Sequence, residues 1–126
     1  MENSEILTAA AALITKETWC RGFQAYDVDG QGVCPNEPEA VKWCLLGACC
    51  KISSIERTYQ LPKDLLGYIG DGIWATDVGW DYDHDPTPSV HTAAIDAWND
   101  GQSSFEIVRD ALLTAVEYAK QDEGHG

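Results

Sequence analysis

Three of the five cysteines lie close together, at positions 44, 49 and 50 of the segment EAVKWCLLGACC. Neighbouring thiols can bind a metal ion or supply a nucleophile. On a helix, however, these three would point at about 0°, 140° and 240° around the axis, so they could not converge on one ion. None of the spacings is the C-x-x-C of a zinc knuckle. We therefore expect them to be reduced and to fill the core, although Cys20 or Cys34 could approach one of them.

A cysteine nucleophile would need a base, and the chain has histidines only at positions 84, 91 and 125. His91 is the one that could serve, with Asn99 or Asp100 to orient it. His91 and Asn99 are eight residues apart and would share a helix face. A small hydrolase or transferase that uses Cys44, His91 and Asn99 is therefore our alternative function. Against it, Cys44 would lie about two turns into its helix, too far from the N-terminus for the helix dipole to lower its pKa.

The segment DVDGQGVCPNEP, which begins at Asp27, resembles the first half of a calcium-binding loop. Its twelfth position is Pro38, where such a loop needs a bidentate glutamate. We expect a tight turn instead. Phosphate-binding glycine loops and the common hydrolase motifs are also absent, so we predict no cofactor and no metal ion.

An acidic and aromatic segment offers a different kind of chemistry. The chain has no lysine or arginine between Lys63 and Arg109. Aromatic side chains interleaved with acids are suited to contact a cationic or basic surface. A divalent cation held by the acids and His84 is a less common outcome than solvated charge. The expected binding residues are Trp74, Asp77, Trp80, Asp81, Tyr82, Asp83, His84 and Asp85.

The net charge of −13 limits the function classes. Such a chain repels nucleic acid and anionic membranes, so we predict a protein partner with a basic surface, no direct nucleic acid binding and no membrane binding. No apolar run is long enough to span a bilayer, and no cleavable signal is evident, so a cytoplasmic location is expected. The oligomeric state is not predicted.

Helical periodicity dominates, and we predict one helical domain over residues 1–126. Helices are expected over 4–17, from a cap at Asn36 to about Ile55, over 62–69, from Thr87 to Gly101, and after Ser103. The second is apolar all round, which is typical of a buried helix. The predicted fold is mainly α: a bundle of four to five helices around that central helix, with a short β-hairpin near 24–34.

Several short motifs stand in order along the chain: W-C at 19–20, D-x-D-G at 27–30, AVKWCLLGA after Pro38, and AIDAWND before the last helix. With its W-C, W-C-x-x-G-A and W-N-D motifs, the chain resembles a family of small uncharacterised proteins of actinobacteria and their phages. The resemblance implies a compact cytosolic accessory or phage-encoded protein, and no activity. The matching positions are Trp19, Cys20, Trp43, Cys44, Trp98, Asn99 and Asp100.

These motif residues allow two interpretations. The tryptophans could be core anchors, with Asn99 and Asp100 ending a helix. Alternatively, Cys20, Cys44, Asn99 and Asp100 could line a shared polar pocket. For the whole protein we predict a non-enzymatic binding function, in which segment 74–85 docks on a basic protein surface. If the gene is carried by a phage, the natural version is an inhibitor of a host defence or nucleic-acid-processing factor, in the host cytoplasm.

Overall fold

The computed structural model describes residues 1–77, 80 and 88–124, and within them the fold is mainly α. The helices are α1 (Asn3–Leu13), α2 (Leu45–Ser53), α3 (Lys63–Thr76), α4 (Pro88–Asp100) and α5 (Phe105–Glu123), with a 3-10 turn, η1 (Thr58–Gln60). Strands β1 (Ala25–Tyr26) and β2 (Lys42–Trp43) form a small antiparallel sheet. The predicted fold class, a helical bundle with a short hairpin, is confirmed.

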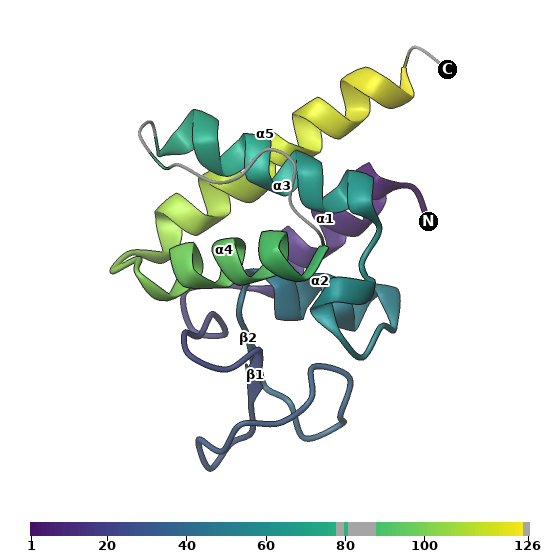
Figure 1. Ribbon diagram of the computed structural model, residues 1–126. Coiled ribbons are helices and arrows are strands. Elements are labelled where there is room, and N and C mark those ends of the chain that lie inside the picture. The colour runs from purple at the N-terminus through teal and green to yellow at the C-terminus, as the bar shows by residue number, and fades with distance from the viewer. Residues whose placement is uncertain (78–79, 81–87, 125–126) are drawn as a thin grey trace.

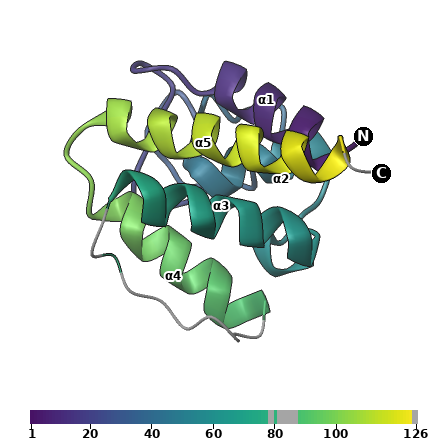
Figure 2. The same cartoon turned by 90° about the horizontal axis from the view of Figure 1, so that it is seen from above.

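Four helices form a layer over the fifth. Figure 2 shows α1, α5, α3 and α4 side by side in that order, with α2 beneath them. The sheet and the loops around it lie below α2, at the lower end of the molecule in Figure 1. No helix among the described residues is long and apolar enough to cross a membrane.

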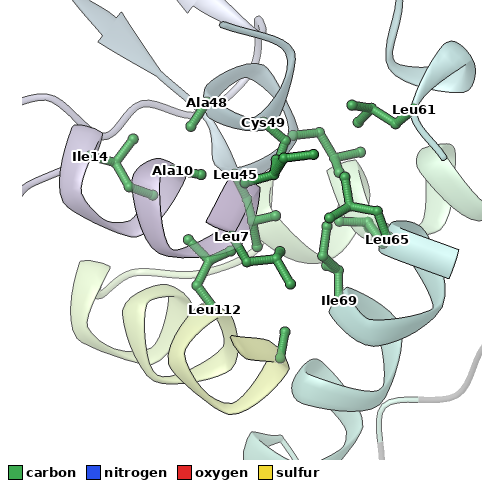
Figure 3. Packing of buried hydrophobic residues seen from close by; sticks show 14 of the residues in the cluster. Leu7, Ala10, Ile14, Leu45, Ala48, Cys49, Leu61, Leu65, Ile69 and Leu112 are labelled. Atoms are coloured by element: carbon green, nitrogen blue, oxygen red, sulfur yellow. The ribbon is translucent and has the colours of Figure 1, made fainter. Parts of the chain in front are cut away.

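The predicted central helix is α2. All six residues from Leu45 to Cys50 are fully buried. Leu7, Ala10 and Ile14 at the N-terminal end of the chain meet them from one side, and Leu65, Ile69 and Leu112 of α3 and α5 complete the cluster (Figure 3). Cys49 and Cys50 therefore fill the core as expected, because a reduced thiol buried among leucines behaves as a small hydrophobe.

Two glycines allow backbones to approach closely in this packing. A Cβ on Gly47 would lie 2.0 Å from the carbonyl oxygen of Gln24, and one on Gly72 would lie 2.4 Å from that of Ala111. Gly47 thus brings α2 against Gln24, the residue just before β1, and Gly72 brings α3 against α5. No side chain larger than hydrogen fits at either position without a backbone shift.

Three predicted helix boundaries were wrong. The second helix begins at Leu45 and not after Asn36, whose Nδ2 instead donates to the Ile55 carbonyl at 2.7 Å. The third continues to Thr76 rather than ending near 69, which places Trp74 on a helix. The first ends at Leu13, because Ile14 turns into an extended conformation.

The predicted hairpin near 24–34 is only part of the β structure in this region. Tyr26 bridges Gly32, and the amide of Val33 donates to the Ala25 carbonyl at 3.0 Å. The regular ladder joins β1 to residues 42–43, which the sequence pattern had placed inside a helix. Long-range pairing of this kind overrides local helical periodicity.

Candidate functional site

Asn99, near the end of α4, connects three parts of the chain. Its side chain is fully buried. Its Oδ1 accepts from the Trp19 indole at 2.9 Å and from the backbone amide of Leu45 at 3.3 Å. Its Nδ2 donates to the Cys20 carbonyl at 3.2 Å. Because its donor and acceptor are both used, Asn99 holds the start of α2 and the loop after α1 against α4.

Asp100 and Arg21 attach the same loop to the end of α4. The carboxylate Oδ1 of Asp100 accepts from the amide of Gly22 at 2.9 Å. Gly22 has a φ of +97°, a conformation that side-chain-bearing residues rarely adopt. The Arg21 guanidinium donates to the Gln102 carbonyl at 2.9 Å and lies over the Trp19 ring, 5.9 Å from its centre. These contacts fix the loop at Arg21 and Gly22 to the end of α4.

Cys44 is the N-cap of α2, a role that the sequence pattern missed. Its Sγ accepts from the amide of Gly47 at 3.3 Å and lies 4.0 Å from Oδ1 of Asp96. Burial, reinforced by the charge of Asp96, raises the pKa of the Cys44 thiol well above its usual value. Burial, with a smaller contribution from Asp100, raises the pKa of Asp96 to about 6. At neutral pH the Cys44 thiol is thus protonated.

Of the four residues of the hypothetical pocket, Cys20 and Asp100 line one cavity, whereas Cys44 and Asn99 do not. A cavity of about 870 Å³ has Cys20 and Asp100 in its wall. Asn99 supports that wall from the interior, through Trp19 and Cys20, and Cys44 lies buried beside Asp96. The core-anchor interpretation also holds for Trp43 and Trp98, which are 8% and 5% exposed. Trp19 is half-buried and faces the cavity.

The sequence patterns marked only part of this cavity. Trp19, Cys20 and Asp100 belong to the motifs, and Val41 and Lys42 lie in the AVKWCLLGA segment, where no role was predicted for them. Arg21 and Tyr26 lie outside every motif. A tight turn was predicted for the segment after Asp27. That turn is present: Oδ1 of Asp27 accepts from the amides of Asp29 and Gln31, at 3.0 and 2.9 Å.

The alternative with a catalytic cysteine receives little support from the geometry. Eight residues of α4 separate His91 from Asn99, a rise of about 12 Å, so Asn99 cannot touch the imidazole. The acidic neighbour of the Cys44 thiol is Asp96. Burial lowers the pKa of His91, and the charge of Asp71 opposes that shift. Nucleophilic catalysis needs a thiolate and an oriented base, and neither the protonated Cys44 thiol nor the distance of Asn99 from His91 provides them.

The acidic and aromatic segment begins on α3. Trp74 is 54% exposed on the last turns of that helix. Asp77, the C-cap residue, accepts from the Trp98 indole at 2.8 Å, and Trp80 packs against the core. The remaining predicted residues lie outside the described part of the chain: Asp81, Tyr82, Asp83, His84 and Asp85. Within the described part, no three His, Cys, Asp or Glu side chains are grouped to hold a metal ion.

Comparison with known proteins identifies one family. A search of curated proteins found no match, and a search of solved structures found none either. One family model, described as a family of unknown function (DUF6197), covers residues 1–118. The chain belongs to this family, and an uncharacterised family is what the sequence had led us to expect.

Proposed function

We propose that the protein is a small acidic, non-enzymatic binding protein that docks on a basic surface of another protein. The observation that carries this proposal is Trp74, a tryptophan 54% exposed on a regular helix, beside acidic residues. Asp71 precedes it by one turn on α3 and is exposed, and Asp77 follows it by three residues. Exposed tryptophans are frequent anchors of protein interfaces.

Each part of the segment has a distinct role in this proposal. Trp74 supplies the apolar anchor, and the acids at 71, 81, 83 and 85 attract the basic partner and orient it. Asp77 has a supporting role, because one of its oxygens receives the Trp98 indole and fixes the end of α3 to α4. An anchor on a fixed helix loses little conformational entropy on binding.

The charge distribution favours a basic protein as the partner. The stretch 64–108 contains nine of the 21 acidic residues and no lysine or arginine. A surface of this kind competes with nucleic acid phosphates for a basic site. If the gene is phage-borne, inhibition of a host defence or nucleic-acid-processing factor in the host cytoplasm follows naturally.

Charge reversal tests this proposal. The immobilised wild-type chain and the double variant Asp81→Lys with Asp83→Lys would be exposed to a lysate of the source cells. The control is Glu37→Lys with Glu39→Lys, on an exposed loop beside the sheet. Each pair changes the net charge of −13 by +4, because each substitution contributes +2. We expect a basic protein to be retained by the wild type and the control, and lost with the first variant.

A second substitution distinguishes a docking site from general charge attraction. Trp74→Ala removes the anchor without changing the charge, and we expect it to weaken retention by at least about tenfold. Circular dichroism would verify that each variant is folded. Equal retention by all variants, or equal loss with the control pair, would contradict the proposal.

A further inference from the structure

The cavity beside the sheet has the size of a small-molecule site. It measures about 870 Å³ and lies between the loop that follows α1 and the chain entering β2. Trp19 and Tyr26 provide aromatic surface, and Val41 and Lys42 come from the β2 side. In Figure 1 the loops around the sheet lie below the helices, away from the C-terminal end of α3. The cavity is thus distinct from the proposed docking surface.

The walls are fixed before any ligand arrives. The hydroxyl of Tyr26 donates to the Arg21 carbonyl at 2.9 Å and accepts from the amide of Phe23 at 3.3 Å. Asn99 orients Trp19 from behind. A site whose walls are held by hydrogen bonds in this way costs little to order on binding.

The charged groups of the cavity differ in what they already bind. Asp27 and Asp100 also line it, but one oxygen of each carboxylate accepts hydrogen bonds from backbone amides of the wall. Lys42 is exposed, and its ammonium carries three donors. Arg21 uses one guanidinium nitrogen on Gln102 and has further N–H groups to offer. Two of the eight basic residues of this acidic chain therefore line the same cavity.

Apolar surface lies beside these cations. Val28 is 83% exposed and Val41 is 41% exposed, and both line the cavity with the half-buried Trp19. Water contacts this apolar surface in the empty cavity, so a ligand that covers it gains from burial. The combination of fixed aromatic and aliphatic walls with two cationic donors defines the class of ligand.

We propose that this cavity binds a small aromatic carboxylate, with its carboxylate between Lys42 and Arg21 and its ring against Trp19 and the two valines. Planar carboxylates match the donor geometry of a guanidinium, and a neighbouring ammonium adds a charge-assisted hydrogen bond. A ring packs against tryptophan and valine without requiring any polar partner.

A series of ligands that share one ring tests the proposal directly. The wild-type chain is titrated with benzoate, benzamide, benzamidine and acetate, and the backbone amides of Gly22, Gly30 and Val41 are followed by nuclear magnetic resonance. We expect saturable shifts with benzoate, at a dissociation constant of about 1 mM or tighter. Benzamide should bind at least about fivefold more weakly because it lacks the charge. Acetate should give no saturation, because it lacks the ring.

A second experiment removes one of the two cations from the cavity. Lys42→Gln should weaken benzoate binding at least about fivefold, whereas Lys63→Gln, which removes the same charge from the exposed start of α3, should leave it unchanged. The ligand series on the wild type decides the question even if Lys42→Gln does not fold. No saturable shift with benzoate, equal binding of benzamide, or tighter binding of benzamidine would overturn the proposal. Equal affinities in the two folded lysine variants would overturn it as well.

Discussion

Asp96 is a carboxyl group whose charged form is disfavoured by burial. It lies on α4 against the buried Cys44 thiol, and burial raises its pKa to about 6. The folded-state pKa is thus above that of an unfolded aspartate, near 3.9. The stabilising contribution of the protonated carboxyl is complete below about pH 4 and is lost as the pH rises through about 6. Ionised Asp96 therefore destabilises the fold at neutral pH.

Replacing Asp96 with asparagine should remove this penalty. We expect Asp96→Asn to raise the free energy of unfolding by about 1 to 2 kcal/mol at neutral pH, and to have little effect near pH 4. Urea unfolding across this pH range measures the difference between variant and wild type. Asp110→Asn, at an exposed position on α5, serves as the control. A difference that does not change between pH 4 and neutral pH would show that the Asp96 carboxyl is not destabilised by burial.

Thiol reactivity separates the two functions that the sequence left open. Cys20, Cys44, Cys49 and Cys50 are buried, and Cys34 is the half-buried thiol. Because burial keeps the Cys44 thiol protonated, we expect iodoacetamide to label Cys34 first and Cys44 only at the rate of unfolding. Peptide mapping after timed labelling measures the order. Rapid labelling of Cys44 in the folded protein would restore the catalytic alternative with Cys44 and His91.

At the scale of elements, the fold depends on close contacts between backbones. Gly47 allows the first turn of α2 to touch the Gln24 carbonyl, just before β1, and Cys44, the N-cap residue, caps the same turn. The start of α2 therefore positions Asn99 through Leu45, and Asn99 in turn positions the wall of the cavity. A substitution at Gly47 should therefore shift the wall of the cavity, through Leu45 and Asn99.

Alanine substitutions at two helical glycines test this packing. We expect Gly47→Ala to lower the free energy of unfolding by at least about 2 kcal/mol, because its Cβ would overlap the Gln24 carbonyl. Gly67→Ala in α3 is the matched control, since nothing lies within 4 Å of its Cβ position. That variant should gain about 0.5 to 1 kcal/mol from helix propensity. Thermal unfolding compares the two, and equal effects would contradict the packing described here.

The same elements show which helix ends local sequence patterns can predict. The helix that begins at Pro88 and ends before Gly101 could be predicted, because the residues that start and stop it, a proline and a glycine, lie directly at its two ends in the sequence. The start of α2 could not, because its N-cap is a cysteine and residues 42–43 pair with β1. The third helix was predicted to end near residue 69, whereas α3 continues through Gly70 and Gly72 and packs on α5.

The candidate sites differ in how much of them the sequence revealed. Asn99, Asp100 and Cys20 were singled out by their motifs, and the structure joins them by hydrogen bonds. Lys42 and Arg21 were not singled out. A lone basic residue in a sequence gives no sign that the folded chain brings it to a cavity. Their placement depends on contacts between residues far apart in the chain.

At the scale of the molecule, the chain has two separate surfaces that differ in their charged residues. The end of α3 exposes Trp74 among acidic residues, and the cavity beside the sheet gathers Arg21 and Lys42. A net charge of −13 dominates at long range and attracts a basic protein from a distance. Local cations act only on a ligand that has already entered the cavity, since charges are screened within about 10 Å at ordinary salt.

The central claim is that docking on a basic protein is electrostatically driven, and the salt dependence of association tests it most directly. The association rate of the retained partner would be measured at rising ionic strength, for the wild type and for Asp81→Lys with Asp83→Lys. We expect the wild-type rate to fall at least about tenfold between low and physiological salt, and the variant to associate slowly at both. A wild-type rate that is independent of salt, or equal rates for the two proteins, would contradict it.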